Sequence, residues 1–324
     1  MRALLRAVLL AGATSIAGCD LEFESQDVVI RHDVEGDALD VLLVYYGVSA
    51  GDGSALRFFP DGGEMDDARA RSLEKGVAAF ERIAAGEREG MIVDWPLHVT
   101  LDRWKNEDEA KLADPEATAQ EKADAAARLP IYELVTLVEC GAFLDDAKRL
   151  CGFQRVRIHP LSKFEALLNA HFDALAREDA RDADDRDDPI GVALRAAKAD
   201  AKTPWFRFDR GTLQIDVPMS MAERASVIRD AAEHVMKSDH IASNGFTKGA
   251  GMWSLFGEWL ATAPSVALEK DRMRATFGTG DAPIRWTIMC PDRPYDPTLY
   301  EALKSRNVSL RDDVKAADLI AAMK

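Results

Sequence analysis

The chain has 324 residues, of which 47% are hydrophobic and 30% are charged, a composition typical of a globular protein with one or two domains. Its formal net charge is −15 at pH 7. Nucleic acid and anionic lipid would both repel such an acidic chain, so we expect no nucleic-acid partner and no broad electrostatic attachment to a membrane.

The first twenty residues contain the three parts of a secretory signal. Arg2 and Arg6 supply positive charge, residues 7–13 form a short apolar run, and small residues then lead to Cys19. The apolar run is too short to cross a hydrocarbon layer of roughly 30 Å as a helix, which argues against a transmembrane segment. We therefore predict a signal peptide over residues 1–18.

Residues 16–19, Ile-Ala-Gly-Cys, match the pattern of an aliphatic residue and two small residues before a cysteine. This stretch resembles the lipobox of bacterial lipoproteins, and the resemblance covers residues 1–20 only. It implies cleavage before Cys19, lipid attachment to its thiol, and an anchor in the bacterial cell envelope on the exported, periplasmic side. An ordinary cleaved signal with an incidental cysteine is the alternative. Asp20 favours the inner membrane in enterobacterial lipoproteins, but this rule is not general, so inner versus outer membrane stays open.

After a short polar tether over residues 19–27, the chain begins with strand patterns. Apolar residues dominate 28–33 and 39–48, and turn residues lie between them, which predicts a hairpin. Residues 65–85 carry their apolar side chains on one stripe, which predicts an amphipathic helix. Residues 105–129 are rich in alanine and charge, and this predicts a surface helix pair split at a proline.

Two further units repeat the order of two strands followed by an amphipathic helix. Their ranges are 131–140, 151–158 and helix 161–177 for the second unit, and 205–208, 212–217 and helix 220–236 for the third. The remaining elements are an apolar helix at 249–263, a strand at 284–289, and terminal helices at 295–304 and 310–323. The pattern predicts an α+β fold, with helices packed on a mixed or antiparallel sheet built from three hairpin-plus-helix units.

The acidic stretch 179–188 has no apolar side chain larger than alanine, so we interpret it as a solvated loop or linker. It would separate residues 28–178, an α+β domain or the first half of one, from a second α+β half at 189–324.

Cysteine positions permit a disulfide, because the exported side of the membrane is oxidising. If the second hairpin closes near Asp145-Asp146, Cys140 and Cys151 lie opposite each other, and we predict a bridge between them. Two buried thiols are the alternative, and Cys290 is left over in either case. No Cys/His spacing is typical of a zinc site.

Asp230 and His234 stand four residues apart on the predicted helix 220–236, so they would share a face. They are the best candidates for a metal site, but they lack the spacing of a helical zinc pair and a marked third ligand, so we expect no metal. A hydrogen-bonded pair on a helix surface is the simpler interpretation.

No short catalytic motif is present, neither a Gly-x-Ser-x-Gly elbow nor a phosphate-binding glycine pattern, so we expect no cofactor and leave the catalytic residues unknown. His32-Asp33 and His159 are interpreted as structural. The sequence favours a lipid-anchored envelope protein that binds an unidentified protein or small ligand, or that has a structural role. An exported hydrolase using Asp/Glu and His residues is the alternative, and a pocket gathering Asp33, Asp230 or His234 with another carboxylate would favour it.

Overall fold

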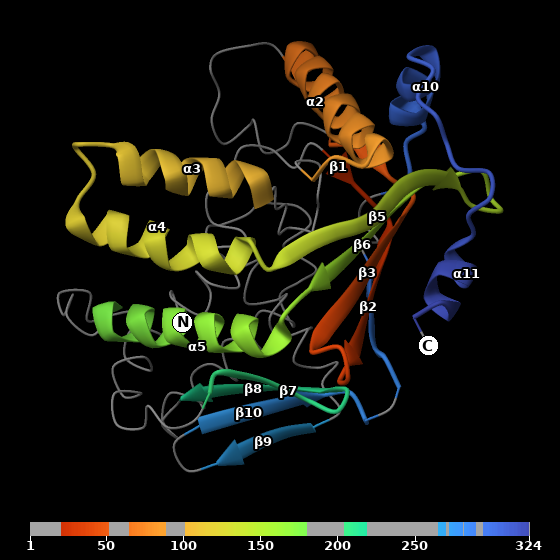
Figure 1. Cartoon of the computed structure of the whole chain (residues 1–324). Helices are drawn as coiled ribbons and strands as arrows, with labels where there is room; N and C mark the ends of the chain where they lie inside the picture. The colour runs from red at the N-terminus through yellow and green to blue at the C-terminus, as the bar shows by residue number, and fades with distance from the viewer. Residues whose placement is uncertain are drawn as a thin grey trace. The chain divides into compact units, whose positions relative to one another are not determined.

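The computed structural model describes most of the chain as helices and antiparallel strands, which confirms the predicted α+β class. The described residues are 21–51, 65–88, 101–179, 204–218, 265–269, 272–280, 282–289 and 294–323. They belong to two compact units (Figure 1). The described residues within 21–164 and 285–323 form one, here called the five-strand unit, and those within 165–284 form the other, the four-strand unit.

The five-strand unit is built on a sheet with the order β11-β2-β3-β6-β5. Its strands are β2 (Ser25–Asp33), β3 (Ala38–Tyr46), β5 (Val135–Leu144), β6 (Leu150–Ile158) and β11 (Ile284–Met289). The β2–β3, β3–β6 and β5–β6 pairs are antiparallel, and the first two predicted hairpins are confirmed. Strand β11 lies beside β2, so a late part of the chain completes a sheet begun by its first half.

The segment predicted as a tether is largely folded into this unit. Strand β1 (Leu21–Glu22) pairs with β4 (Ser49–Ala50), and Leu21 and Phe23 are buried. The ring of Phe23 packs against Tyr45 of β3, with 5.3 Å between the ring centroids. The prediction is therefore wrong from residue 21 onward, because apolar contacts with distant residues hold this stretch in place.

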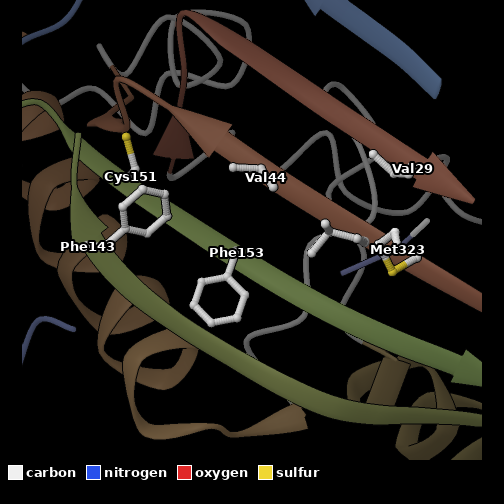
Figure 2. Close-up of a cluster of buried hydrophobic side chains, with 7 residues drawn as sticks. Val29, Val44, Phe143, Cys151, Phe153 and Met323 are labelled. Atoms are coloured by element: carbon white, nitrogen blue, oxygen red, sulfur yellow. The ribbon is translucent and has the colours of Figure 1, made fainter. Parts of the chain in front are cut away.

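Helices cover one face of the five-strand sheet, and the C-terminal segment packs on the other. The covering helices are α2 (Met65–Ala85), α3 (Leu101–Ala113) and α4 (Ala119–Tyr132), and the helix on the opposite face is α11 (Ala316–Ala321). Helix α10 (Thr298–Ser305) instead packs beside α2 and β4. Val156 of β6 packs with Trp104 and Tyr132 on the helix side. On the opposite face, Phe143, Phe153 and Met323 belong to one buried cluster (Figure 2).

Helices α3 and α4 form the predicted helix pair, although Trp104 and Tyr132 from them belong to a buried core cluster, so the pair is not confined to the surface. Thr118 caps α4 together with Glu121, and a buried ion pair links the two helices. Arg128 Nε donates to Asp108 Oδ2 at 2.8 Å, and a terminal nitrogen donates to Oδ1 at 2.5 Å. This bidentate geometry offsets the desolvation of both charges. Pro130 lies inside the last turn of α4, so the following strand begins at Val135 and not at the predicted residue 131.

The four-strand unit contains an antiparallel sheet with the order β7-β8-β10-β9. Its strands are β7 (Phe206–Asp209), β8 (Thr212–Pro218), β9 (Ser265–Glu269) and β10 (Arg272–Phe277). The third predicted hairpin is confirmed, with Phe208 opposite Leu213. Arg210 and Gly211 connect its strands with φ of 46° and 76°, the left-handed conformations that a two-residue I′ turn requires.

Helix α5 (Leu161–Asp179) supports the β7 edge of this sheet. Phe206 N donates to Asn169 Oδ1 at 2.9 Å, and Asn169 Nδ2 donates back to Phe206 O at 2.9 Å. Phe208 N donates to Glu165, and Trp205 Nε1 donates to Asp173 Oδ1 at 2.7 Å. Helix side chains thus satisfy backbone groups that an edge strand would otherwise leave open for pairing.

The units divide the chain differently from the halves that the sequence suggests. The chain passes from one unit to the other within α5, between Phe164 and Glu165, and passes back at the start of β11. Asp179 ends α5, whereas the rest of the predicted acidic loop lies outside the described residues, as do the predicted helices 220–236 and 249–263. Among the described residues, no helix combines the length and the apolar character needed to cross a membrane.

Replacing Asp108 with Asn should lower the free energy of unfolding by about 3 kcal/mol, because the Arg128 charge would stay buried without its counterion. Urea denaturation measures this change. The matched control is Arg103→Met, which removes an exposed ion pair with Glu107 and should cost less than about 1 kcal/mol. Equal losses in the two variants would contradict the assigned role of the buried pair.

Candidate functional site

A group of charged side chains interrupts the apolar face of the five-strand sheet on the side that carries Met323. Alternate residues of a strand face the same side, so Asp40 of β3 shares this face with Leu42. The antiparallel register places Arg31 of β2 and Arg157 of β6 on either side of Asp40. It also places Arg155 opposite Leu42. Three arginines from two strands therefore surround one aspartate of the strand between them.

Arg31, Arg155 and Arg157, together with Asp40 and Asp33, are here called the arginine cluster. Distances within it show which side chains form ion pairs. The Asp40 side chain is 1% exposed, and its Oδ2 lies 3.1 Å from Arg31 and 3.9 Å from Arg155. Arg157 donates to Asp40 Oδ1 at 3.2 Å and to Asp33 Oδ2 at 2.9 Å. Asp33 also accepts a hydrogen bond from Gly36 N, and this bond, followed by that of Arg157, lowers the pKa of its carboxyl group.

The arginines keep part of their surface in contact with solvent. Their side chains are 36% exposed at Arg31, 31% at Arg155 and 35% at Arg157, whereas the carboxylate between them is buried. A guanidinium group presents five N–H donors in a planar fork that matches carboxylate and phosphate oxygens. The cluster can therefore recognise an oxyanion. The cluster consists of arginine and aspartate side chains, whose guanidinium donors suit the recognition of such a group.

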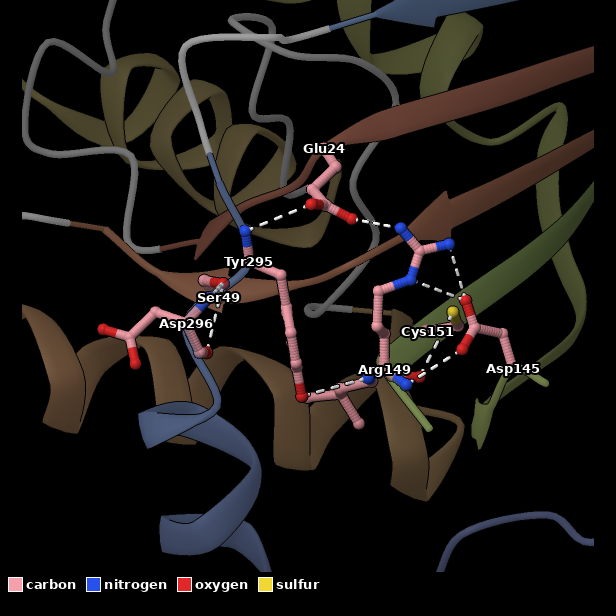
Figure 3. Close-up of polar contacts among 8 residues, drawn as sticks. Glu24, Ser49, Asp145, Arg149, Cys151, Tyr295 and Asp296 are labelled. Carbon is pink, nitrogen blue, oxygen red and sulfur yellow. Dashed lines mark hydrogen bonds and ion pairs between the residues drawn. The ribbon is translucent and has the colours of Figure 1, made fainter. Parts of the chain in front are cut away.

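A second polar network fastens the chain segment before α10 to the rest of the five-strand unit. Its members are Glu24, Ser49, Asp145, Arg149, Tyr295 and Asp296 (Figure 3). Arg149 pairs with both Glu24 and Asp145, and Glu24 also accepts a hydrogen bond from Tyr295 N at 3.2 Å. These groups bind one another, which indicates a structural function for the network.

Of the residues singled out in the sequence, Cys19, Asp230 and His234 lie outside the described residues. Asp33 lies in the arginine cluster, paired with Arg157. The structure thus brings Asp33 together with arginines that the sequence did not single out. Their only signal in the sequence is the alternation of charged and apolar residues along strands, as at Arg155-Val156-Arg157.

His159 lies near Asp37 and Ser162, residue types that occur in hydrolase triads. The Ser162 hydroxyl donates to the Asp37 carboxylate at 2.6 Å, and the Ser162 backbone N donates to it at 2.9 Å. His159 Nδ1 lies 3.3 Å from the backbone oxygen of Asp37. Because the hydroxyl is bound to the carboxylate and not to the imidazole, the arrangement caps the first turn of α5 and lacks the nucleophile–base contact of a triad. The structural interpretation of His159 is therefore supported.

The predicted disulfide is wrong, because both cysteines are free thiols. The β5–β6 register pairs Cys151 with Phe143 and Cys140 with Gln154. An offset of three residues places the two side chains on opposite faces of the sheet. The turn closes with Asp145 N donating to Arg149 O, further along the chain than the sequence suggested. Burial raises the pKa of the Cys151 thiol to about 11.

Within the described residues, no group of three or more His, Cys, Asp and Glu side chains is placed to hold a metal ion. Comparison with protein-family models, curated proteins and solved structures finds no match to this chain.

The unfolding midpoint in urea should be the same with and without a thiol reductant, because no bond joins Cys140 to Cys151. Alkylation followed by mass spectrometry should also leave Cys151 unmodified in the native protein and label it after denaturation. A midpoint that falls when reductant is added would show that the thiols are bridged.

The Asp37 cap should give stability a dependence on pH. Hydrogen bonds from Ser162 lower the pKa of the Asp37 carboxyl in the folded protein. The stabilisation of the folded state by the ionised Asp37 carboxylate is therefore complete above the unfolded-state pKa. It is lost as the pH falls through the lower, folded-state pKa. We expect Asp37→Asn to be less stable than the parent at pH 7, with the difference shrinking toward pH 3 in urea denaturation. A difference that does not change with pH would contradict this role, and Ser162→Ala should weaken the same dependence.

Proposed function

We propose that this protein is a lipoprotein of the bacterial cell envelope, anchored through Cys19 and acting through a binding or structural role. The supporting observation is the Ile16-Ala17-Gly18-Cys19 stretch after a charged start and a short apolar run. Two or more acyl chains on one cysteine hold a protein stably at a bilayer, where a single chain binds reversibly. The anchor faces the periplasm, and the choice between inner and outer membrane stays open.

A binding role agrees with the chemistry of the arginine cluster, whose donors can recognise an oxyanion. An exported hydrolase is the alternative function. It would use Asp/Glu and His residues. Asp33, one of its candidate carboxylates, is paired with Arg157, and Asp230 and His234 lie outside the described residues.

Replacing Cys19 with Ser should abolish lipid attachment, because serine has no thiol for thioether formation. In a bacterial host, the parent protein should sediment with membranes and have the intact mass of a chain cut before Cys19 and acylated. The Cys19→Ser variant should lack the acyl mass. Cys140→Ser is the matched control, since it removes a thiol from β5 and should leave the anchor unchanged. An acylated Cys19→Ser variant, or a parent that keeps Met1, would refute the proposal.

A further inference from the structure

We propose that Arg31, Arg155 and Arg157 form a binding site for an oxyanion of the phosphate type. The inference rests on the binding role proposed above and gives that role a ligand class. It does not depend on the lipid anchor, so the failure of one proposal can be distinguished from the failure of the other.

Positive charge converges on one carboxylate oxygen of Asp40. Asp40 Oδ2 lies 3.1 Å from a terminal nitrogen of Arg31, 3.3 Å from one of Arg157 and 3.9 Å from one of Arg155. Three guanidinium groups thus share one carboxylate oxygen, and Asp33 supplies the only other carboxylate that these arginines pair with among the described residues. The cluster has one more positive than negative charge, although the whole chain is strongly acidic. A bound anion would reduce the repulsion among the guanidinium groups.

A second buried aspartate on the same sheet face provides an internal comparison. Asp27 is 3% exposed and accepts hydrogen bonds from the Tyr46 hydroxyl at 3.0 Å, the Thr287 hydroxyl at 2.6 Å and Arg285 at 2.9 Å. One arginine and two neutral hydroxyls are therefore sufficient partners for a buried carboxylate in this protein. Three arginines around Asp40 exceed that requirement, and the excess needs another explanation.

Of the three arginines, Arg155 contributes least to neutralising the charge of Asp40. Its nearest nitrogen is the most distant of the three from Asp40. Glu139, its neighbour across β5–β6, pairs with Arg311 at 3.3 Å, although Arg311 also pairs with Asp313 at 2.7 Å. Arg155 Nε is buried with no hydrogen-bond partner, while the side chain as a whole is 31% exposed. Arg155 thus combines a charge that is only distantly compensated with a surface that a ligand can reach.

The geometry favours a small ligand with several acceptor oxygens. Asp40 and Asp33 orient the guanidinium groups of Arg31 and Arg157, which leaves further N–H donors on each planar fork. Phosphate oxygens accept such donors in pairs. Inorganic phosphate, a soluble phosphorylated compound and a phospholipid headgroup all present this chemistry.

The test uses the full chain with Cys19→Ser, so that lipidation does not add its own membrane binding. Inorganic phosphate is titrated calorimetrically at constant ionic strength, and the same protein is mixed with vesicles of phosphatidylglycerol or of phosphatidylcholine. Arg155→Met should weaken phosphate binding by about tenfold or more, and Arg155→Lys should restore only part of it because lysine lacks the fork. Arg103→Met removes one arginine from an exposed helix surface and should leave the affinity unchanged.

Binding of phosphate, with or without phosphatidylglycerol, that depends on Arg155 supports the site and a soluble source of the ligand. Binding of phosphatidylglycerol alone with the same dependence supports a headgroup. Unchanged urea midpoints in Arg155→Met separate loss of binding from loss of folding. The proposal is overturned if neither ligand binds, if Arg155→Met binds as well as its parent, or if Arg103→Met loses as much affinity.

Discussion

Strand β3 is buried on both faces, and the layers of the five-strand unit depend on this constraint. Leu42 and Leu43 are each 1% exposed although they are neighbours, because consecutive side chains of a strand point to opposite sides. A strand without a solvent face needs partners along both edges, which β2 and β6 provide. Asp40 on this strand is equally cut off from water. Its charge is met by side chains from the flanking strands, Arg31 of β2 and Arg157 of β6.

Local patterns in the sequence predict much of the fold. The helical stripe of α2, the hairpin of β2 and β3, and the turn at Arg210-Gly211 all follow from residues near one another in the chain. Local reasoning fails where distant contacts decide. Pro130 is expected to break a helix, yet α4 continues to Tyr132, and Arg88 donates hydrogen bonds to the Tyr132 and Val135 carbonyls just beyond the proline. Phe23 is predicted to lie in a polar tether, because its packing partner, Tyr45, lies on another strand and is distant in the sequence.

The candidate site is harder to anticipate from the sequence, since it is a product of strand register. A single hairpin does not place Arg31 beside Arg157, because the two residues meet only across Asp40 of the strand between them. The cysteines illustrate the same difficulty. A turn displaced along the chain places Cys140 and Cys151 on opposite faces of the sheet. A wrong prediction of strand register therefore leads to a wrong prediction of a disulfide.

With the lipid anchor proposed at Cys19, the early start of β1 would set the distance between the folded protein and the membrane. With Cys19 carrying the lipid, only Asp20 separates the acylated residue from the first strand, and two extended residues span about 7 Å. A connection of that length would keep the folded domain from moving away from the membrane into the periplasm. The five-strand unit would lie close to the lipid headgroups. A ligand bound to it would therefore stay near one surface of the bilayer.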